Sequence, residues 1–223
     1  MNDQWREPPS EPPHKPFFDL TLDDISARFR ELLTFLPQFF RNPIEGIKKI
    51  PSWDWPTVII LEIFVGAVAG VLGGIVARHF LAILGGIFVG PIMGLILSFV
   101  SATVIFYAVL FFMKTELEFK KVFIVVVLSK LPAQFVEVLA PLGRAPIHLI
   151  SIVLTASFLS IGLVYNFMLE KKKTVQIVGA LALIAVLMWA YTTIEEVTTK
   201  NIKVQDYTPE SLDQIHKELN QGH

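Results

Sequence analysis

Five polar side chains fall within otherwise apolar stretches of the chain, and they are the best candidates for a functional site. Lys130, Gln134 and Glu137 are spaced to share one face of a helix, while Glu62 and Asn166 lie in two other stretches. A charged residue at the centre of a bilayer costs about 3 kcal/mol, so we expect these groups to face protein or water. They form a candidate intramembrane polar line, which serves either as a proton or ion pathway or as a structural ion pair.

The spacing also predicts which of these charges can meet. Lys130 and Glu62 lie at similar depths from the same side, so their side chains meet if the two helices touch. Glu137 lies nearer the other side, where Arg144 or Arg78 could reach it. We favour the structural interpretation, because neither a pair of broken helices nor an inverted repeat is evident in the sequence.

The stretches around these residues are long enough to cross a membrane. A span needs about 20 mostly apolar residues, and 53% of this chain is hydrophobic while only 17% is charged. We therefore predict an all-α polytopic membrane protein, a bundle of five transmembrane helices. The predicted spans are residues 57 to 77, 91 to 113, 122 to 140, 147 to 169 and 175 to 194. Residues 81 to 113 are too many for one upright span, so a break or a tilt is expected. Pro91 is the natural boundary between the second span and residues 81 to 90, a short outer-leaflet or re-entrant piece, and the alternative is one long tilted helix.

The basic residues predict the orientation of these spans. Of the 19 Lys and Arg residues, 13 precede the first span, follow the second or follow the fourth. Cytoplasmic loops are enriched in Lys and Arg, so we expect a cytoplasmic N-terminus, an external C-terminus and a place in the cell membrane. No apolar signal-peptide core precedes the first span, which is therefore expected to direct insertion itself.

Four regions follow from composition and helix signals. Residues 1 to 17 are rich in proline and predicted to be a disordered arm. Residues 18 to 56, which we call the collar, are predicted to form cytoplasmic amphipathic and interfacial helices. Residues 57 to 196 are the transmembrane domain, and residues 197 to 223 are an external tail with a short helix.

Two helix starts are visible within the collar. Thr21 followed by Asp24 resembles a capping box, and the apolar periodicity after it is expected to stop at Pro37. Asn42 is the predicted cap of a second helix with Pro43 at its first position. The collar either contacts a partner or lipid, or seals the end of the bundle.

Glycine residues form two small-residue faces in the first and second apolar regions. Small residues at a spacing of four let helix backbones approach closely. We expect these faces to pack within one chain in preference to forming a dimer surface. The helix-packing glycines are Gly66, Gly70, Gly74, Gly86, Gly90 and Gly94.

The sequence gives no sign of catalysis. It has no cysteine, its five histidines are scattered, and no metalloprotease, serine-hydrolase or phosphate-loop motif is present. We expect no enzymatic activity, no bound metal or cofactor, and no nucleic-acid binding, because the basic residues flank the membrane segments.

The layout resembles the YIP family, the Ypt/Rab-interacting five-span membrane proteins, and especially its compact prokaryotic type. The resemblance covers roughly residues 38 to 196. It rests on Asn42-Pro43, the span from Pro91 to Met113, the sequence from Phe119 to Phe123 that opens a polar third span, and the basic loop before the fifth span. It implies a non-enzymatic membrane organiser or adaptor that contacts the bilayer and another membrane protein or a second copy of itself. The alternative is a small carrier or channel that uses the polar line.

Overall fold

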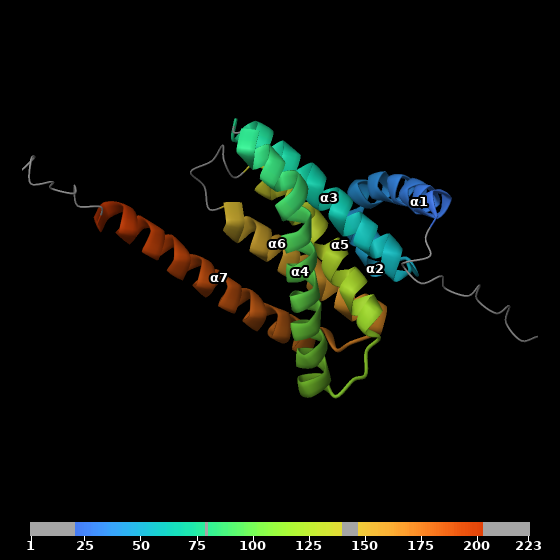
Figure 1. The fold of residues 1–223 in the computed structure, drawn as a ribbon. Helices are drawn as coiled ribbons and strands as arrows, with labels where there is room; N and C mark the ends of the chain where they lie inside the picture. The colour runs from blue at the N-terminus through green and yellow to red at the C-terminus, as the bar shows by residue number, and fades with distance from the viewer. Residues whose placement is uncertain (1–20, 79, 140–146, 203–223) are drawn as a thin grey trace, which may run out of the picture. The chain divides into compact units, whose positions relative to one another are not determined.

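The computed structural model describes residues 21–78, 80–139 and 147–202, and for residue 82 and residues 195–202 it describes the backbone alone (Figure 1). The predicted proline-rich arm and the predicted helix of the tail lie outside these residues. All regular structure in the described residues is α-helical, which confirms the all-α class. The helices are α1 (Leu22–Arg41), α2 (Pro43–Lys48), α3 (Trp55–Val76), α4 (Phe80–Met113), α5 (Phe119–Glu137), α6 (Ile147–Phe167) and α7 (Lys171–Ile202).

Four helical segments are long and apolar enough to cross a membrane. They are Trp55–Val76, Ile83–Met113, Ile147–Phe167 and Lys171–Ile194. α5 is about 28 Å long by its helical rise, but it carries four charged residues, Lys120, Lys121, Lys130 and Glu137. The described chain thus has the helices of a multi-pass membrane protein, with four clear candidate spans and a fifth, more polar helix.

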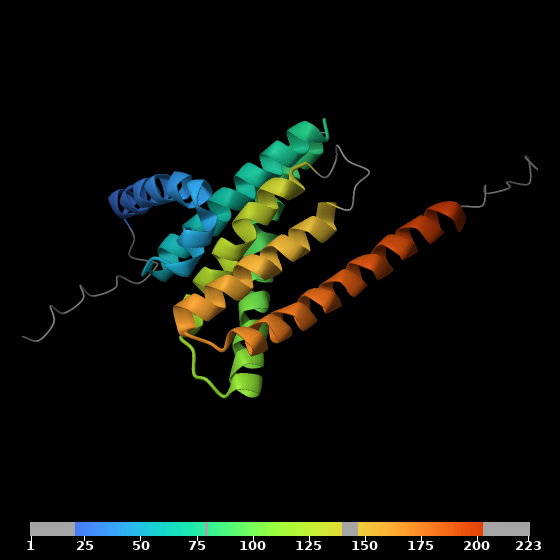
Figure 2. The same cartoon turned by 180° about the vertical axis from the view of Figure 1, so that it is seen from behind.

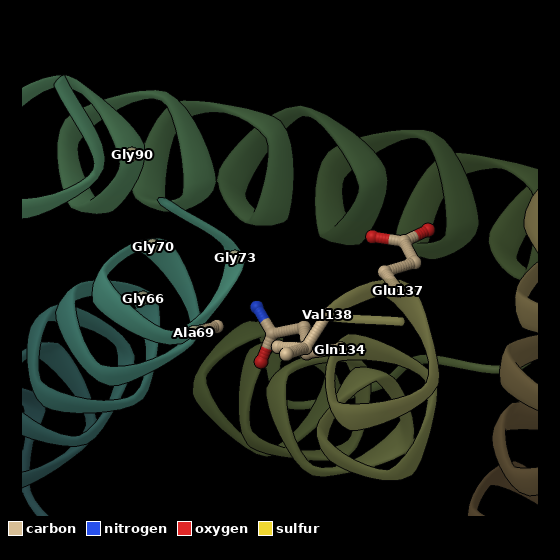
Figure 3. A pocket seen from close by; sticks show the side chains of 8 residues that line it. All are labelled: Gly66, Ala69, Gly70, Gly73, Gly90, Gln134, Glu137 and Val138. Atoms are coloured by element: carbon tan, nitrogen blue, oxygen red, sulfur yellow. The ribbon is translucent and has the colours of Figure 1, made fainter. Parts of the chain in front are cut away.

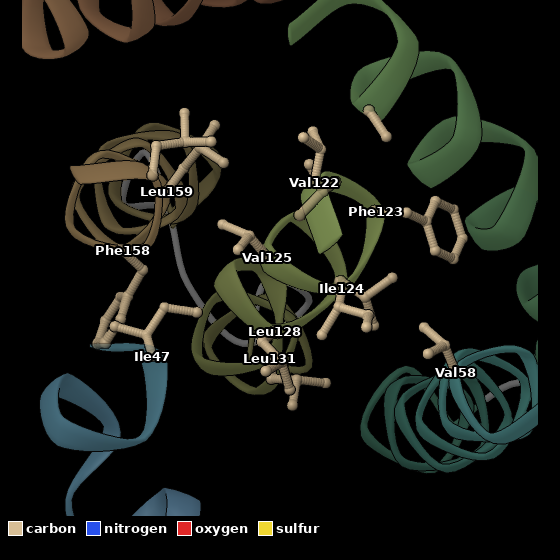
Figure 4. Close-up of a cluster of buried hydrophobic side chains, with 14 of the residues drawn as sticks. Ile47, Val58, Val122, Phe123, Ile124, Val125, Leu128, Leu131, Phe158 and Leu159 are labelled. Carbon is tan, nitrogen blue, oxygen red and sulfur yellow. The ribbon is translucent and has the colours of Figure 1, made fainter. Parts of the chain in front are cut away.

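α5 is the most enclosed helix of the bundle. Every residue from Val122 to Ser129 is buried, so this helix has no exposed face along more than two turns. Figure 4 shows these side chains meeting Ile47 of α2, Val58 of α3, and Phe158 and Leu159 of α6. A helix that is apolar on all sides and contacts α2, α3, α4 and α6 forms the core around which the others pack.

α3 and α4 form a tight antiparallel pair that runs side by side in both views (Figures 1 and 2). A Cβ atom built on Gly70 would lie 2.5 Å from the Cα of Gly86, and one built on Gly86 would lie 2.6 Å from the Cα of Gly70. A Cβ on Gly74 would lie 2.6 Å from the backbone nitrogen of Ile83. The glycine faces predicted from spacing therefore lie against each other within one chain, and at Gly70, Gly74 and Gly86 the backbones are too close for a larger residue.

Pro91 does not end a helix, contrary to the prediction. α4 continues through it, and residues on both sides of it pack on α3: Gly86 against Gly70, and Gly94 against Glu62. A proline inside a helix costs about 3 kcal/mol through a lost hydrogen bond and a steric clash. Continuous packing along α3 offsets that cost. At 34 residues, α4 is about 50 Å long, longer than the hydrocarbon is thick.

Pro37 was also wrongly predicted to end a helix. α1 runs to Arg41, and Thr21 and Asp24 form the predicted capping box at its start. Leu36 and Phe39, on either side of Pro37, are both buried. Burial of these large side chains against the bundle stabilises the last turn and outweighs the local penalty of the proline. α2 begins at Pro43 with Asn42 as its cap, as predicted.

The chain forms two compact units, Met1–Ala182 and Leu183–His223, and the boundary between them falls within α7. In the first unit, Thr174 and Val178 of α7 are buried. The part of α7 in the second unit continues the apolar helix, with Leu183, Ile184 and Leu187 among its side chains.

The close approach of α3 and α4 at Gly70 and Gly86, which we call the glycine crossing, predicts different outcomes for a glycine-to-alanine substitution at two positions of α3. Gly70→Ala should lower the stability of the purified protein by about 1–3 kcal/mol, because the new methyl group overlaps the backbone of α4. Gly73→Ala is the matched control, because nothing lies within 4 Å of a Cβ at that position. Its expected effect is neutral or slightly stabilising. Thermal unfolding in detergent measures both, and equal losses in the two variants would contradict the close approach.

Candidate functional site

Glu62, Ser98 and Lys130 form a buried polar cluster between α3, α4 and α5. The side chain of Glu62 is only 1% exposed, and its Oε1 lies 2.8 Å from the Nζ of Lys130. The Ser98 hydroxyl donates to the same oxygen at 2.6 Å, and Nζ also donates to the Ser98 Oγ. One carboxylate oxygen therefore receives two donors, and the opposite charges of α3 and α5 neutralise each other.

The glycine face of α4 makes room for this cluster. A Cβ on Gly94 would lie 3.3 Å from Glu62 Oε1, so a larger residue there would press on the carboxylate. The carbonyl of Gly94 lies 3.5 Å from Lys130 Nζ, at the edge of hydrogen-bonding distance.

The cluster ends against apolar packing. On α5, the residues from Val122 to Leu128, between the pair and the start of the helix, are all apolar and buried. The second oxygen of Glu62, Oε2, is buried with no hydrogen-bond partner among the described residues. On α5, therefore, no polar group continues from the pair toward Phe119.

About one helical turn from the cluster, α3, α4 and α5 line a pocket of about 330 Å³. It is lined by Gly66, Ala69, Gly70, Gly73, Gly90, Gln134, Glu137 and Val138 (Figure 3). One wall is thus the glycine-rich backbone of α3 and α4, and the other is the last turn of α5. The Oε1 atom of Gln134 is buried without a hydrogen-bond partner among the described residues.

Glu137 does not pair with Arg78 in the described structure, and Arg144 lies outside the described residues. The carboxylate of Glu137 instead lies near His148 on α6, whose Nδ1 is 3.9 Å from Glu137 Oε1. Both side chains are about half exposed. At that distance the contact is an ion pair only when the imidazole is protonated.

Asn166, on α6, lies away from this polar line and contacts the collar. Its Nδ2 donates to the carbonyl of Ile47 at 2.8 Å, and its Oδ1 accepts from the backbone N–H of Ile50 at 3.2 Å. It thereby satisfies backbone groups at the end of α2 that the short helix leaves open. Ile47 itself is fully buried, beside Gly162 of α6. Asn166 was predicted to be a fifth member of the polar line, but its side chain binds the collar backbone instead.

Two further contacts attach α1 to the start of α3. The Trp53 indole N–H donates to Glu31 Oε1 at 2.8 Å, and the Arg28 guanidinium pairs with Asp54 at 2.7 Å. Asp54 is also the N-cap of α3, accepting from the backbone N–H of Thr57. Burial alone would raise the pKa of Asp54, but the hydrogen bonds from Arg28 and Thr57 outweigh burial and lower that pKa from 3.8 to about 2.

Sequence reasoning missed Ser98 and the residues of these collar contacts. Asp54 followed by Trp55 and Pro56 is a cap signal that could have been found. Ser98 and Glu31 carry no such local signal, because their partners lie 36 and 22 residues away. Among the described residues, no group of three His, Asp or Glu side chains could hold a metal ion.

Comparison of the chain with family models, curated proteins and solved structures finds no match in any of the three. The fold and the site define the class: an all-α protein with the helices of a multi-pass membrane protein, in which a buried ion pair joins three helices beside an open pocket.

The buried pair predicts non-additive effects of charge removal. Lys130→Leu should lower the free energy of unfolding by about 3–5 kcal/mol, because it leaves the Glu62 carboxylate buried and uncompensated. Adding Glu62→Gln to that variant should recover more than half of the loss, because the buried charge is then gone. Thermal unfolding and the yield of folded protein measure this. Normal stability of Lys130→Leu would rule out a structural role.

The Arg28–Asp54 pair predicts a loss of stability in acid. Since the folded-state pKa of Asp54 is lowered, its stabilisation, about 1–2 kcal/mol, is complete above about pH 4 and disappears as the pH falls toward about 2. Asp54→Asn, which keeps a cap acceptor but not the charge, is the reference variant. The difference in melting temperature between the two proteins should be constant near neutral pH and shrink in acid. A difference that is independent of pH would contradict the pairing.

Proposed function

We propose that this chain is a five-span membrane protein of the YIP type that acts, without catalysis, as a membrane organiser or adaptor. α5 is the fifth span in this proposal. Its length of about 28 Å and the neutralisation of Lys130 by Glu62 both support that role. The distribution of basic residues supports a cytoplasmic N-terminus and an external C-terminus in the cell membrane.

The observation that carries the proposal is a collar held firmly on the bundle that still presents apolar side chains outward. Asn166 of α6 holds the backbone of the collar, and within the collar Asp54, the N-cap of α3, and Trp53 hold α1 at the start of α3. On α1, Leu22 is 85% exposed, Ile25 39% and Leu33 48%. Fixed apolar residues on a surface are typical of a protein-binding site.

A protein partner fits this surface better than the bilayer does. The polar side chains of α1 are of both signs, with Asp23 and Asp24 near Arg28 and Arg30. A helix that binds anionic lipid strongly is rich in Lys and Arg on its polar face. The partner in this proposal is another membrane protein or a second copy of this chain.

The carrier or channel alternative has less support. A pathway along the polar line would need polar groups on both sides of the Lys130–Glu62 pair, whereas α5 is apolar and buried from Val122 to Leu128. Asn166 is occupied by the backbone of α2. These contacts favour an architectural role for the pair.

Partner recovery from native membranes tests the proposal. The tagged chain is purified in mild detergent, and proteins recovered in near-stoichiometric amount are quantified by mass spectrometry. Leu33→Arg should reduce recovery of a specific partner by about ten-fold, because it places a charge where an apolar contact would be buried.

Thr34→Arg, at the neighbouring exposed position, is the matched control and should leave recovery unchanged. Truncating the chain at residue 36 would be a poorer test, since it removes Leu32 and Leu36 from the core. Equal recovery with the wild-type chain and both variants, or recovery of the chain alone, would refute an adaptor role for this surface.

A further inference from the structure

The pocket about one helical turn from the buried pair, which we call the slot, has one wall made largely of backbone. Gly66, Gly70 and Gly73 of α3 and Gly90 of α4 contribute no side chains to it. Nothing lies within 4 Å of a Cβ built on Gly73, so the space in front of that residue is open. Gly70 is therefore required for the contact between α3 and α4. Gly73 is not required for that contact and instead borders the pocket.

The opposite wall offers two polar groups without committed partners. In Figure 3 the amide nitrogen of Gln134 and the carboxylate of Glu137 point to the side of α5 on which the glycine wall lies. Gln134 makes no side-chain hydrogen bond within the described part of the chain, where the charged contact of Glu137 is with His148 at 3.9 Å. Residues three apart on a helix lie about 5–6 Å from each other. An N–H donor and an anionic acceptor thus stand side by side.

The electrostatics of the pocket favour a cation at Glu137. Lys130, the other charged residue on this face of α5, is paired with Glu62 and forms no ion pair with Glu137 in the described structure. The last turns of α3 and α5 also lie at the pocket, and helix C-termini carry partial negative charge. A primary ammonium group has three N–H donors and matches these acceptors.

The depth of the pocket indicates where such a group would come from. Glu137 is about 27 Å along α5 from Phe119, close to the full thickness of the hydrocarbon. If α5 spans the membrane, a step that rests on the proposed function, Glu137 lies at the level of the lipid headgroups. A ligand that also presents a phosphodiester would accept a hydrogen bond from the Gln134 amide.

We propose that this pocket binds the headgroup of an ethanolamine phospholipid. Its primary ammonium donates to the Glu137 carboxylate, and its phosphodiester accepts from the Gln134 amide. The glycine wall admits the headgroup because no side chain occupies the slot. A choline headgroup, whose nitrogen carries three methyl groups, offers the same charge but no N–H donor.

Lipid competition tests the assignment. The full-length protein, purified in detergent, is mixed with equal amounts of ethanolamine, choline and glycerol phospholipids of the same acyl chains, and bound lipid is counted by native mass spectrometry. We expect about ten-fold preference for the ethanolamine lipid over the choline lipid, as one lost set of charge-assisted hydrogen bonds would give.

Three variants make the test specific to the pocket. Gly73→Leu should abolish the preference by filling the slot, and Glu137→Gln should reduce it to near unity. Gly85→Leu is the matched control, because its Cβ position is also open but does not line the pocket. It should bind as the wild-type protein does, and so should Leu33→Arg, which separates this proposal from the adaptor role.

Equal binding of the three lipids, or a preference that survives Gly73→Leu, would overturn the proposal. Displacement of the lipid by an equal concentration of free ethanolamine would also overturn it, because the site would then be one for a soluble amine.

Discussion

The interaction on which the rest of this structure depends is the buried contact of Lys130 with Glu62. Two opposite charges can be buried in an apolar bundle only when they meet at hydrogen-bonding distance, and here they meet at 2.8 Å. That distance requires α3 and α5 to be neighbours, and it requires α4 to offer a small residue, Gly94, beside the carboxylate. The glycine crossing also keeps α4 close to α3, and Ser98 of α4 then lies within hydrogen-bonding distance of Glu62.

The two ends of the bundle differ in structure on either side of this contact. Toward the start of α5 the packing is apolar, Asn166 of α6 binds the collar, and Asp54 and Trp53 hold α1 at the start of α3. Toward the end of α5 the glycine wall leaves an open pocket with Gln134 and Glu137. A rigid collar suits the recognition of a partner, whereas an open, polar pocket suits a small headgroup. The ion pair, between α3 and α5, lies between these two ends.

Local signals in the sequence predicted where helices start. Tertiary packing determined where they end and which polar side chains meet. The caps at Thr21 and Asn42 were predictable because they depend on residues three apart. Pro37 and Pro91 were wrongly predicted to end helices, because a local penalty of about 3 kcal/mol is small beside the packing of a whole helical face. The partner of Asn166 lies about 120 residues away in sequence, and no local pattern reveals such a contact.

The most direct test of this account is proton flux into proteoliposomes that contain the wild-type protein. An architectural ion pair predicts no pH-dependent flux above that of protein-free liposomes, because the polar cluster ends against the buried apolar turns of α5. A flux that appears with the wild-type protein and disappears with folded, correctly inserted Lys130→Leu would contradict the account and would make the pair part of a transport pathway.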